Sequence, residues 1–350
     1  MARSPSRPRP NVARRTTQLN LELFTMKPRE KNTGECTATP TSGRAHSRTF
    51  LLPGGYVDEH GVSHREVDLN SVTGLDEELL AEVQPAVCSA RIVTALLTRC
   101  VKRVGLLEPV TASLIGDLLV GDREFLMLKL REMTLGTRLD AVVRCPAPDC
   151  GVRMDLKLNL DDFCAEAAPI SSRFFALDCP DQNPDVNEIS VEFRLPTGAD
   201  QDAVALGVGV DEASAVRKLL ARTISRINSQ SPVEEQAVAT LPEGVQRRIE
   251  EQMEKLAPQG FVELEITCLE CQELFSVPFD PASFFLAEIM GGRQSLEREV
   301  HFLAWHYHWR ERDILALPRR KRRRYIELIH QEALGMFTAE THSRGGAFLE

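Results

Sequence analysis

Cys145-Pro-Ala-Pro-Asp-Cys150 and Cys268-Leu-Glu-Cys271 are two cysteine pairs that lie far apart in this chain but in matching surroundings. Each pair is preceded and followed by a stretch in which apolar and polar residues alternate, the pattern typical of a half-buried strand. Each pair therefore marks the turn of a predicted β-hairpin. A turn that carries two thiolates a few residues apart directs both sulfurs towards one point, and this is half of a tetrahedral zinc site.

Two such halves predict a zinc-ribbon-like unit. All four positions of a structural Zn2+ site would then be thiolates, which leaves no open position for a reactive water, so the site would stabilise the fold and do no chemistry. The segments that follow the two hairpins match as well, since Phe163 and Phe284 each lie thirteen positions after the last cysteine of their pair. This similarity suggests a pseudo-repeat that is folded onto itself. The predicted metal ligands are Cys145, Cys150, Cys268 and Cys271.

Other uses of the cysteines stay open at this point. Two disulfides are one alternative, but no apolar signal segment opens the sequence, which favours a reducing cytosol and a metal site. Loss of the metal in this lineage is another, because 117 residues separate Cys150 from Cys268, whereas ribbon knuckles are usually about 15 to 20 residues apart. The cysteines that we interpret as small buried hydrophobes are Cys88, Cys100, Cys164 and Cys179.

Composition narrows the class of protein. The chain has 43% hydrophobic and 27% charged residues, which is ordinary for a soluble globular protein, and its length allows two or three domains. No apolar run approaches the roughly 18 residues that a membrane span requires, so membrane insertion is not expected. The net charge is −9, although residues 1–48 hold ten Lys or Arg against three Glu. The remainder is therefore strongly acidic, which makes nucleic acid an improbable partner because counterion release needs a cationic surface.

The order of predicted elements indicates an α+β fold in which helical layers flank small antiparallel hairpins. A β-hairpin is predicted over 50–57 and 63–69, and further strands over 174–177 and 189–195. Helices are predicted over 76–84, 87–104, 111–118, 121–135, 211–228, 242–256, 281–290, 294–308 and 318–334.

These elements group into segments with different compositions. Residues 1–48 are rich in Arg, Ser, Thr and Pro and are expected to be disordered, the alternatives being a transit peptide or translated sequence upstream of an initiator at Met26. Residues 49–140 form a hairpin plus a helical unit, and 141–290 form the split zinc-ribbon-like unit with an inserted α/β segment. Residues 291–338 form a C-terminal helical docking module, and 339–350 a flexible tail.

Motifs for catalysis are missing from the sequence. It has no Gly-x-Gly-x-x-Gly, no phosphate-binding loop ending in Gly-Lys-Ser/Thr, no His-Glu-x-x-His and no Gly-x-Ser-x-Gly elbow. We therefore expect a protein that is not an enzyme.

Two dense clusters near the C-terminus are candidates for partner binding instead. One is the aromatic run over 305–309, and aromatic groups this concentrated usually anchor a core or an interface. The other is the basic run over 319–324 at a predicted helix start, where positive charge opposes the helix macrodipole. An acidic partner, or the acidic body of the protein itself, is expected to offset that charge. The candidate partner-binding residues are Trp305, His306, Tyr307, His308, Trp309, Arg319, Arg320, Arg322, Arg323 and Arg324.

Several short motifs resemble one family in their order along the chain. They are Leu52-Pro-Gly-Gly-Tyr56, Val72-Thr-Gly-Leu-Asp-Glu-Glu78, Gly121-Asp-Arg-Glu-Phe-Leu126 and then Cys145-Pro146 with Cys150-Gly151. This order resembles the baseplate hub assembly chaperone family of T-even-type contractile-tailed phages, with relatives in phage-like contractile injection systems. The stretch from His301 to Tyr325 is similar to a short module encoded among the same injection-system genes.

The resemblance implies a non-enzymatic role in building the baseplate hub. Its partners would be other baseplate or hub proteins, and it would act in the cytoplasm during assembly, with incorporation into the finished particle left open. The alternative is a zinc-ribbon protein that binds nucleic acid through its basic C-terminal helix. The acidic residues that flank the second cysteine pair argue against that alternative, because they would repel phosphate.

Overall fold

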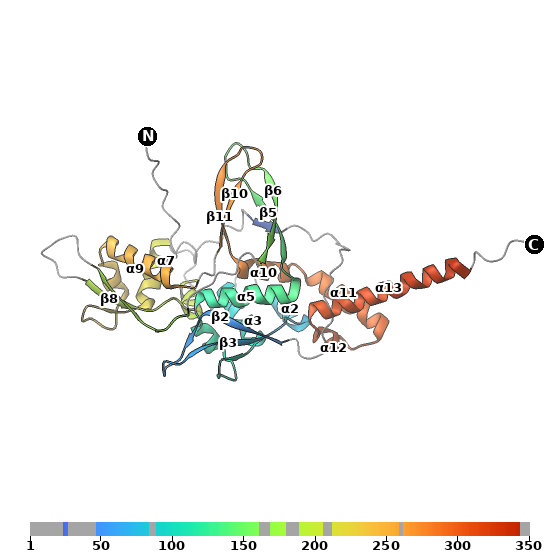
Figure 1. The fold of residues 1–350 in the computed structure, drawn as a ribbon, viewed down its shortest axis with the longest axis horizontal. Coiled ribbons are helices and arrows are strands. Elements are labelled where there is room, and N and C mark those ends of the chain that lie inside the picture. Colours follow the sequence, from blue (N-terminus) through green and yellow to red (C-terminus); the bar gives the residue numbers. More distant parts are fainter. Residues whose placement is uncertain are drawn as a thin grey trace, which may run out of the picture.

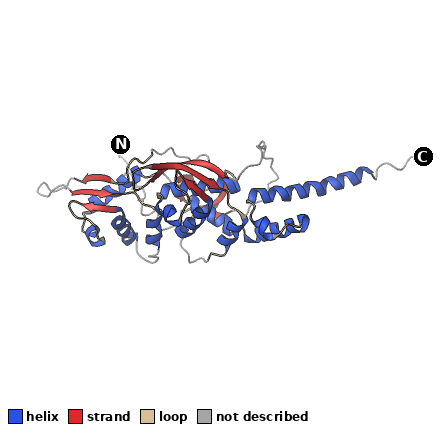
Figure 2. Ribbon diagram, turned by 90° about the horizontal axis from the view of Figure 1, so that it is seen from below, coloured by secondary structure: helices blue, strands red, loops and turns tan. Residues whose placement is uncertain are grey.

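The computed structural model of the chain describes residues 24–26, 47–83, 89–160, 169–179, 189–205, 212–258 and 262–343. The predicted α+β class is confirmed, since helices pack against small antiparallel sheets in an elongated molecule (Figures 1 and 2). Most of the N-terminal segment predicted to be disordered, and part of the predicted tail, lie outside the described residues. The described residues of that N-terminal segment form strands: β1 (Phe24–Met26), which pairs antiparallel with β5, and Ser47–Arg48 at the start of β2.

Repeat A, as we name residues 47–160, begins with a hairpin and ends with the first cysteine hairpin. Strand β4 pairs with β3 and completes a three-stranded sheet of order β2-β3-β4. Its elements in chain order are β2 (Ser47–Val57), β3 (Ser63–Asn70), α2 (Gly74–Ala81), α3 (Ser89–Cys100), β4 (Val101–Val104), α4 (Ala112–Asp117), α5 (Val120–Leu135), β5 (Arg138–Arg144) and β6 (Arg153–Asn159).

Repeat B, residues 175–279, has the same order of elements, and its sheet has the corresponding order β7-β8-β9. The repeat that the sequence suggested around the cysteines therefore extends over both whole segments. The elements of repeat B are β7 (Phe175–Cys179), β8 (Ile189–Phe193), α6 (Gly198–Ala205), α7 (Glu212–Thr223), β9 (Ile224–Ile227), α8 (Glu235–Ala239), α9 (Glu243–Leu256), β10 (Val262–Thr267) and β11 (Leu274–Phe279).

Two of the predicted helices are wrong at their C-terminal ends. The helix predicted over 87–104 ends at Cys100, and the one predicted over 211–228 ends at Thr223. In both repeats the chain continues directly as a strand, β4 or β9, that pairs with the second strand of the hairpin. Pairing with a neighbouring strand outweighs local helix propensity here, because β-branched residues such as Val101 and Ile224 fit a half-buried sheet.

Equivalent residues make equivalent interactions in the two repeats. Thr73 and Asp76 cap the N-terminus of α2, and Asp76 also binds Arg99 at the end of α3. In repeat B the Asp200 carboxylate accepts from the backbone and hydroxyl of Thr197 and from Arg222. The two Thr residues are 124 positions apart and the two Arg residues 123. A Thr-Gly-x-Asp corner, defined as 73–76 in repeat A and 197–200 in repeat B, thus begins the first helix of each repeat.

The remaining C-terminal part is helical. α10 (Pro281–Met290) packs on α5 and α2. Unit C, as we name residues 293–343, comprises α11 (Arg293–Tyr307), α12 (Glu311–Leu315) and α13 (Arg319–Ser343). α11 and α12 pack against α2 in the way that α3 and α4 pack against α6. Unit C therefore packs on repeat A with a helix arrangement like that of α3 and α4 on repeat B.

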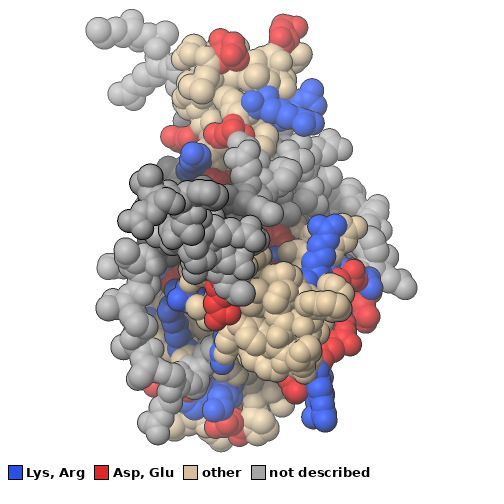
Figure 3. Space-filling view, turned by 90° about the vertical axis from the view of Figure 1, so that its right-hand side faces the viewer, with Lys and Arg blue, Asp and Glu red and all other residues tan. Residues whose placement is uncertain are grey.

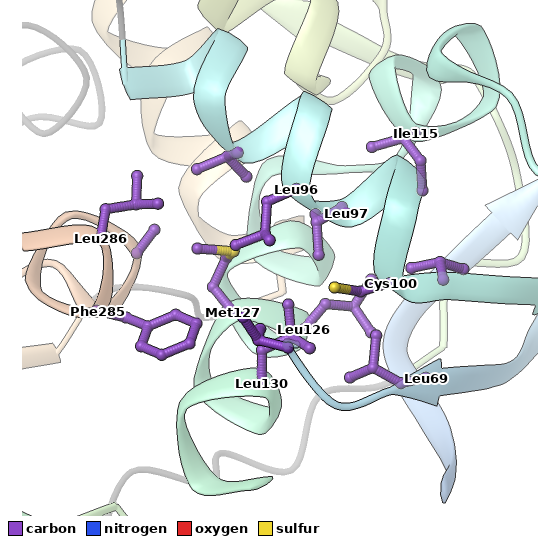
Figure 4. Close-up of a cluster of buried hydrophobic side chains, with 14 of the residues drawn as sticks. Leu69, Leu96, Leu97, Cys100, Ile115, Leu126, Met127, Leu130, Phe285 and Leu286 are labelled. Carbon is purple, nitrogen blue, oxygen red and sulfur yellow. The ribbon is translucent and has the colours of Figure 1, made fainter. Parts of the chain in front are cut away.

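The largest hydrophobic core belongs to repeat A. Figure 4 shows Leu96, Leu97 and Cys100 of α3 facing Leu126, Met127 and Leu130 of α5, with Phe285 and Leu286 of α10 on the other side. These side chains are almost completely buried, which anchors α10 to repeat A although it follows repeat B in the chain. A second core in repeat B lies between its sheet and α7, α8 and α9.

The three parts follow one another in the spatial order B, A, C along the long axis (Figure 1). Repeat A contacts repeat B where the Gly198 N–H donates to the Leu118 carbonyl over 3.1 Å, and unit C contacts repeat A where the Gly74 N–H donates to Leu317 over 3.2 Å. The two contacts use equivalent positions. Each Thr-Gly-x-Asp corner therefore docks on the junction between a short helix and a long helix of the neighbouring part.

Candidate metal centre and C-terminal unit

The two cysteine hairpins stand out from the body of the molecule, with their turns side by side at the far end (Figure 1). β5 pairs with β6 over seven residue pairs, and β10 pairs with β11 over six. At their base the hairpins share a small core that includes Leu139, Leu160 and Phe279. This shared core holds the two turns in register across the 117 residues that separate them in sequence.

Both turns have the same backbone construction. The N–H of the first cysteine donates to the residue two positions beyond the second cysteine, from Cys145 to Val152 and from Cys268 to Glu273, over 2.9 Å in each case. The residue just after the second cysteine has a left-handed backbone in both turns, with φ of +60° at Gly151 and at Gln272. The two knuckles therefore present their sulfurs in the same local geometry although one is two residues longer.

The predicted convergence of the four cysteines is confirmed. The four Sγ atoms all lie within 4.8 Å of one another. The first cysteine of each knuckle approaches the second cysteine of the other, with 3.6 Å between Cys145 and Cys271 and 3.7 Å between Cys150 and Cys268. This pairing is what a two-fold relation between the knuckles produces.

The sulfur set fits a tetrahedral metal ion. Four sulfurs at about 2.3 Å from a central zinc ion lie about 3.8 Å from each other, close to the observed separations. A disulfide would need about 2.05 Å between sulfurs, and all four cysteines are free thiols. Cys145 and Cys268 are buried, whereas Cys271 is exposed at the tip. The residues present can therefore hold one ion at the end of the paired hairpins.

The thiols experience different electrostatic surroundings. The backbone N–H groups of Cys271 and Glu270 lower the pKa of the Cys268 thiol to about 7. Burial raises the pKa of the Cys145 thiol to about 12. An ion that bound all four would have to displace the proton of Cys145, so metal binding would release protons.

The basic run at the start of α13 is divided between the interior and the surface. Arg322 is fully buried and binds Glu77 of α2 over 2.7 Å and Glu299 of α11 over 3.0 Å. Arg319 is also buried and lies 3.7 Å from Glu77. Arg324 is exposed and reaches only Glu327 of its own helix. The acidic body of the protein therefore offsets much of this charge.

The surface of this end of the molecule is mixed in charge. Where side chains are drawn in Figure 3, Lys and Arg are dispersed among Asp and Glu and do not form one basic block. Arg320 is exposed and Arg323 is half-buried within 3.8 Å of Glu299. The buried arginines are out of reach of a phosphate backbone, so nothing in this arrangement favours the nucleic-acid alternative.

The aromatic run is also divided between the interior and the surface. Tyr307 stacks on Trp309 with 4.7 Å between ring centroids, and Trp309 meets the edge of Tyr325 in α13 at 4.9 Å. These rings are half-buried and pack against the core of unit C, which consists of Leu303, Ile314 and Ile329. Trp305 is 72% exposed on the outer face of α11.

The two histidines of the run are both exposed and play local roles. The ring of His306 lies 2.8 Å from the carbonyl of Phe302, one turn back in α11. His308 has a left-handed backbone and ends that helix. The two histidines do not form a joint metal site in the part of the chain that the structure describes. The residues there that could hold a metal ion are the four cysteines.

The two Thr-Gly-x-Asp corners are functional positions outside the predicted site residues. The sequence does contain a signal for them, since the same four-residue pattern occurs at 73–76 and at 197–200. Gly is required in both corners because a Cβ on Gly198 would overlap the guanidinium of Arg123, and one on Gly74 would lie 2.9 Å from Nη1 of Arg322. The corners therefore position the three parts of the molecule relative to one another.

A family model described as T4 bacteriophage base plate protein matches residues 59–286. The chain belongs to this family. The match begins at the β2–β3 turn and ends in α10, so it covers repeat A from β3 onward, all of repeat B and all four clustered cysteines. Unit C lies beyond the matched residues. Comparisons with curated proteins and with solved structures gave no match.

Membership of the base plate family is consistent with a phage structural role and with other phage proteins as partners. Within the described residues, no helix is both long and apolar enough to cross a membrane.

Proposed function

We propose that this chain is a non-enzymatic component of a contractile phage or phage-like baseplate that acts in assembly of the hub. The observation that carries this proposal is the base plate family match over residues 59–286. An elongated body with separate exposed features at its ends suits a protein that holds other subunits at fixed spacing. The protein would act in the cytoplasm while the baseplate is built.

We further propose that the four cysteines hold a structural Zn2+. When bound, the ion would cross-link the two knuckles and supply rigidity to the projecting hairpins. The chain's own residues already set the geometry, because the shared core at the hairpin base and the matching turns bring the sulfurs together. The knuckle tip also carries Leu269, which is 79% exposed and is available for contact with a partner.

The metal proposal is tested by elemental analysis of the purified chain, with one zinc ion expected for each molecule. Cys268→Ser should lose the metal and unfold at lower temperature. Cys100→Ala is the matched control, since Cys100 is equally buried but lies in the core of repeat A. It should lower stability through a small cavity while retaining the metal. Metal retention by Cys268→Ser at full stoichiometry would exclude the four-cysteine site.

The partner-binding face that we propose for unit C is centred on Trp305. Its side chain is exposed whereas those of Tyr307 and Trp309 are half-buried, and large aromatic side chains dominate interface energetics. Deletion of unit C is a poor test, because it would remove the Arg322–Glu77 contact with repeat A together with Trp305. A point substitution is sharper.

The assembly role is tested by co-expression of the full chain with baseplate hub proteins. Trp305→Ser should reduce their co-purification about tenfold or more, as expected for an aromatic hot spot. Leu106→Ser is the matched control, since Leu106 is 87% exposed in a turn of repeat A. Equal co-purification of both variants would exclude Trp305 as the contact. If baseplates assembled without this chain still contain every hub protein, the assembly role itself is excluded.

A further inference from the structure

The same kind of junction docks a Thr-Gly-x-Asp corner twice within one molecule. The α4–α5 junction of repeat A docks the corner at 197–200, and the α12–α13 junction of unit C docks the corner at 73–76. In each case a short antiparallel bridge joins the two segments, between Leu119 and Thr197 or between Thr73 and Pro318.

Repeat B has the equivalent junction, between α8 and α9. There the carbonyl of Leu241 accepts from the Gln246 side chain, as the carbonyl of Leu317 accepts from Arg322. Leu317 accepts an additional backbone hydrogen bond from the docked corner. Among the described residues no corner is docked on Leu241.

Burial shows that this third junction is open. Its contact residues are Ala239 and Pro242, and both are exposed. The equivalent positions in unit C, Leu315 and Pro318, are buried. Repeat A shows the same contrast, since Gly116 at the position of Ala239 is buried. The difference is confined to the docking face, because Thr240 is exposed and so are its two equivalents, Asp117 and Ala316.

Charge determines which junction holds α2 most strongly. The first turn of α2 is acidic, with Asp76 and Glu77 in it and Glu78 following, and its last turn contains no basic residue. The first six residues of α13 are all Lys or Arg, whereas the six equivalent residues of α9 hold two Arg and one Glu. Gln246 replaces the buried Arg322 that binds Glu77. Charge therefore favours unit C over the α8–α9 junction at this corner.

We propose that unit C is an exchangeable cap, and that when it is released the α8–α9 junction of a second copy of this chain docks on the exposed corner at 73–76. The occupant is a second copy because the corner and the junction already fit each other in two equivalent contacts. Repeat B and unit C lie at opposite ends of the long axis (Figure 1). The contact between copies would therefore be head-to-tail, and such an interface extends into a chain of molecules unless a cap blocks it.

The experiment measures the self-association of the full-length chain by sedimentation velocity over a range of concentrations. Arg322→Glu places a carboxylate against Glu77 and Glu299 and should release the cap. Arg322→Gln gives unit C the residue that α9 carries at this position and should release it more weakly. Near-UV circular dichroism establishes that each variant is folded. The wild type should sediment as a monomer, and both variants should form dimers and larger species as concentration rises, with association at least about tenfold stronger than in the wild type.

Second substitutions in the Arg322→Glu background locate the contact. Ala239→Glu adds a carboxylate on the docking face opposite acidic α2 and should restore the monomer. Thr240→Glu adds the same charge one residue away, at a position that is exposed in all three equivalents, and should leave association unchanged. If Arg322→Glu does not fold, the same pair is tested in the Arg322→Gln background.

Three results would overturn the proposal. Folded cap variants that stay monomeric would show that the corner does not accept a second copy. Association that survives Ala239→Glu would place the contact elsewhere. Wild-type association as strong as that of the variants would show that unit C does not act as a cap.

Discussion

The two Asp residues of the Thr-Gly-x-Asp corners provide a matched pair for testing how burial sets the strength of a helix cap. We expect Asp200→Ala to destabilise the protein much more than Asp76→Ala. Asp200 is fully buried and accepts five hydrogen bonds, two from Arg194, one from Arg222 and two from Thr197. Asp76 makes a similar cap with Thr73 but binds only Arg99, whose side chain is 45% exposed.

The magnitudes follow from these differences. Loss of a helix cap costs about 1 kcal/mol in either repeat. Removing one partner of a buried ion pair costs about 3 to 5 kcal/mol, and we take the lower end because Arg194 and Arg222 are 22% and 41% exposed. Asp200→Ala should therefore cost about 3 to 4 kcal/mol. Asp76→Ala should cost about 1 to 2 kcal/mol, since an exposed pair adds less than about 1.

The pH dependence gives a second signature for Asp200. Burial raises the pKa of its carboxyl, but the hydrogen bonds and charge of Arg194, with further help from Arg222, lower that pKa by more, so it lies below its ordinary value of 3.8. A lowered pKa in the folded state means a stabilising contribution that is complete above the unfolded pKa and is lost as pH falls through the folded value. The wild type should thus lose stability below about pH 4, and Asp200→Asn should remove that part of the loss.

Urea unfolding followed by circular dichroism measures both effects, at pH 7 and at steps down to about pH 3. Hydrogen exchange of α6 and α2 assigns any separate transitions to the two repeats. Losses of unfolding free energy that agree within about 0.5 kcal/mol for the two alanine variants would refute the reasoning, because loss of the helix cap alone would then account for both.

Two further pairs of substitutions test the packing. Gly121→Ala should destabilise the protein by more than about 1 kcal/mol, because its Cβ would overlap the carbonyl of Pro258. Gly244→Ala, at the equivalent position with open space around it, should stabilise the protein by up to about 1 kcal/mol. Thermal unfolding of both variants measures the difference, and equal effects would contradict the placement of Pro258. Arg322→Met should cost about 3 to 5 kcal/mol by stranding buried carboxylates, while Arg324→Ala should cost less than about 0.5. Unfolding by urea measures that pair, and a similar small cost for both would show that the basic run is wholly at the surface.

Local signals in the sequence determined most of the secondary structure and the chemical type of the site. Alternation around the cysteine pairs predicted both hairpins, and the pairs themselves predicted a site of four thiolates. The hairpins and each half of the site depend on residues a few positions apart, so a single segment carries enough information to specify them. The same is true of the helix starts, such as the capped start of α2 at Thr73. The meeting of the two halves of the site across 117 residues depends on the fold.

Only the tertiary structure decided features that depend on distant partners. Val101 and Ile224 continue helical patterns, but each becomes a strand because a hairpin edge lies beside it to accept hydrogen bonds. The charged run of α13 predicted an acidic counterpart, but only the fold shows that Arg322 is buried because Glu77 and Glu299 approach it from two other helices. The free energy of such contacts is set by the burial of both partners, and burial is a property of the assembled fold.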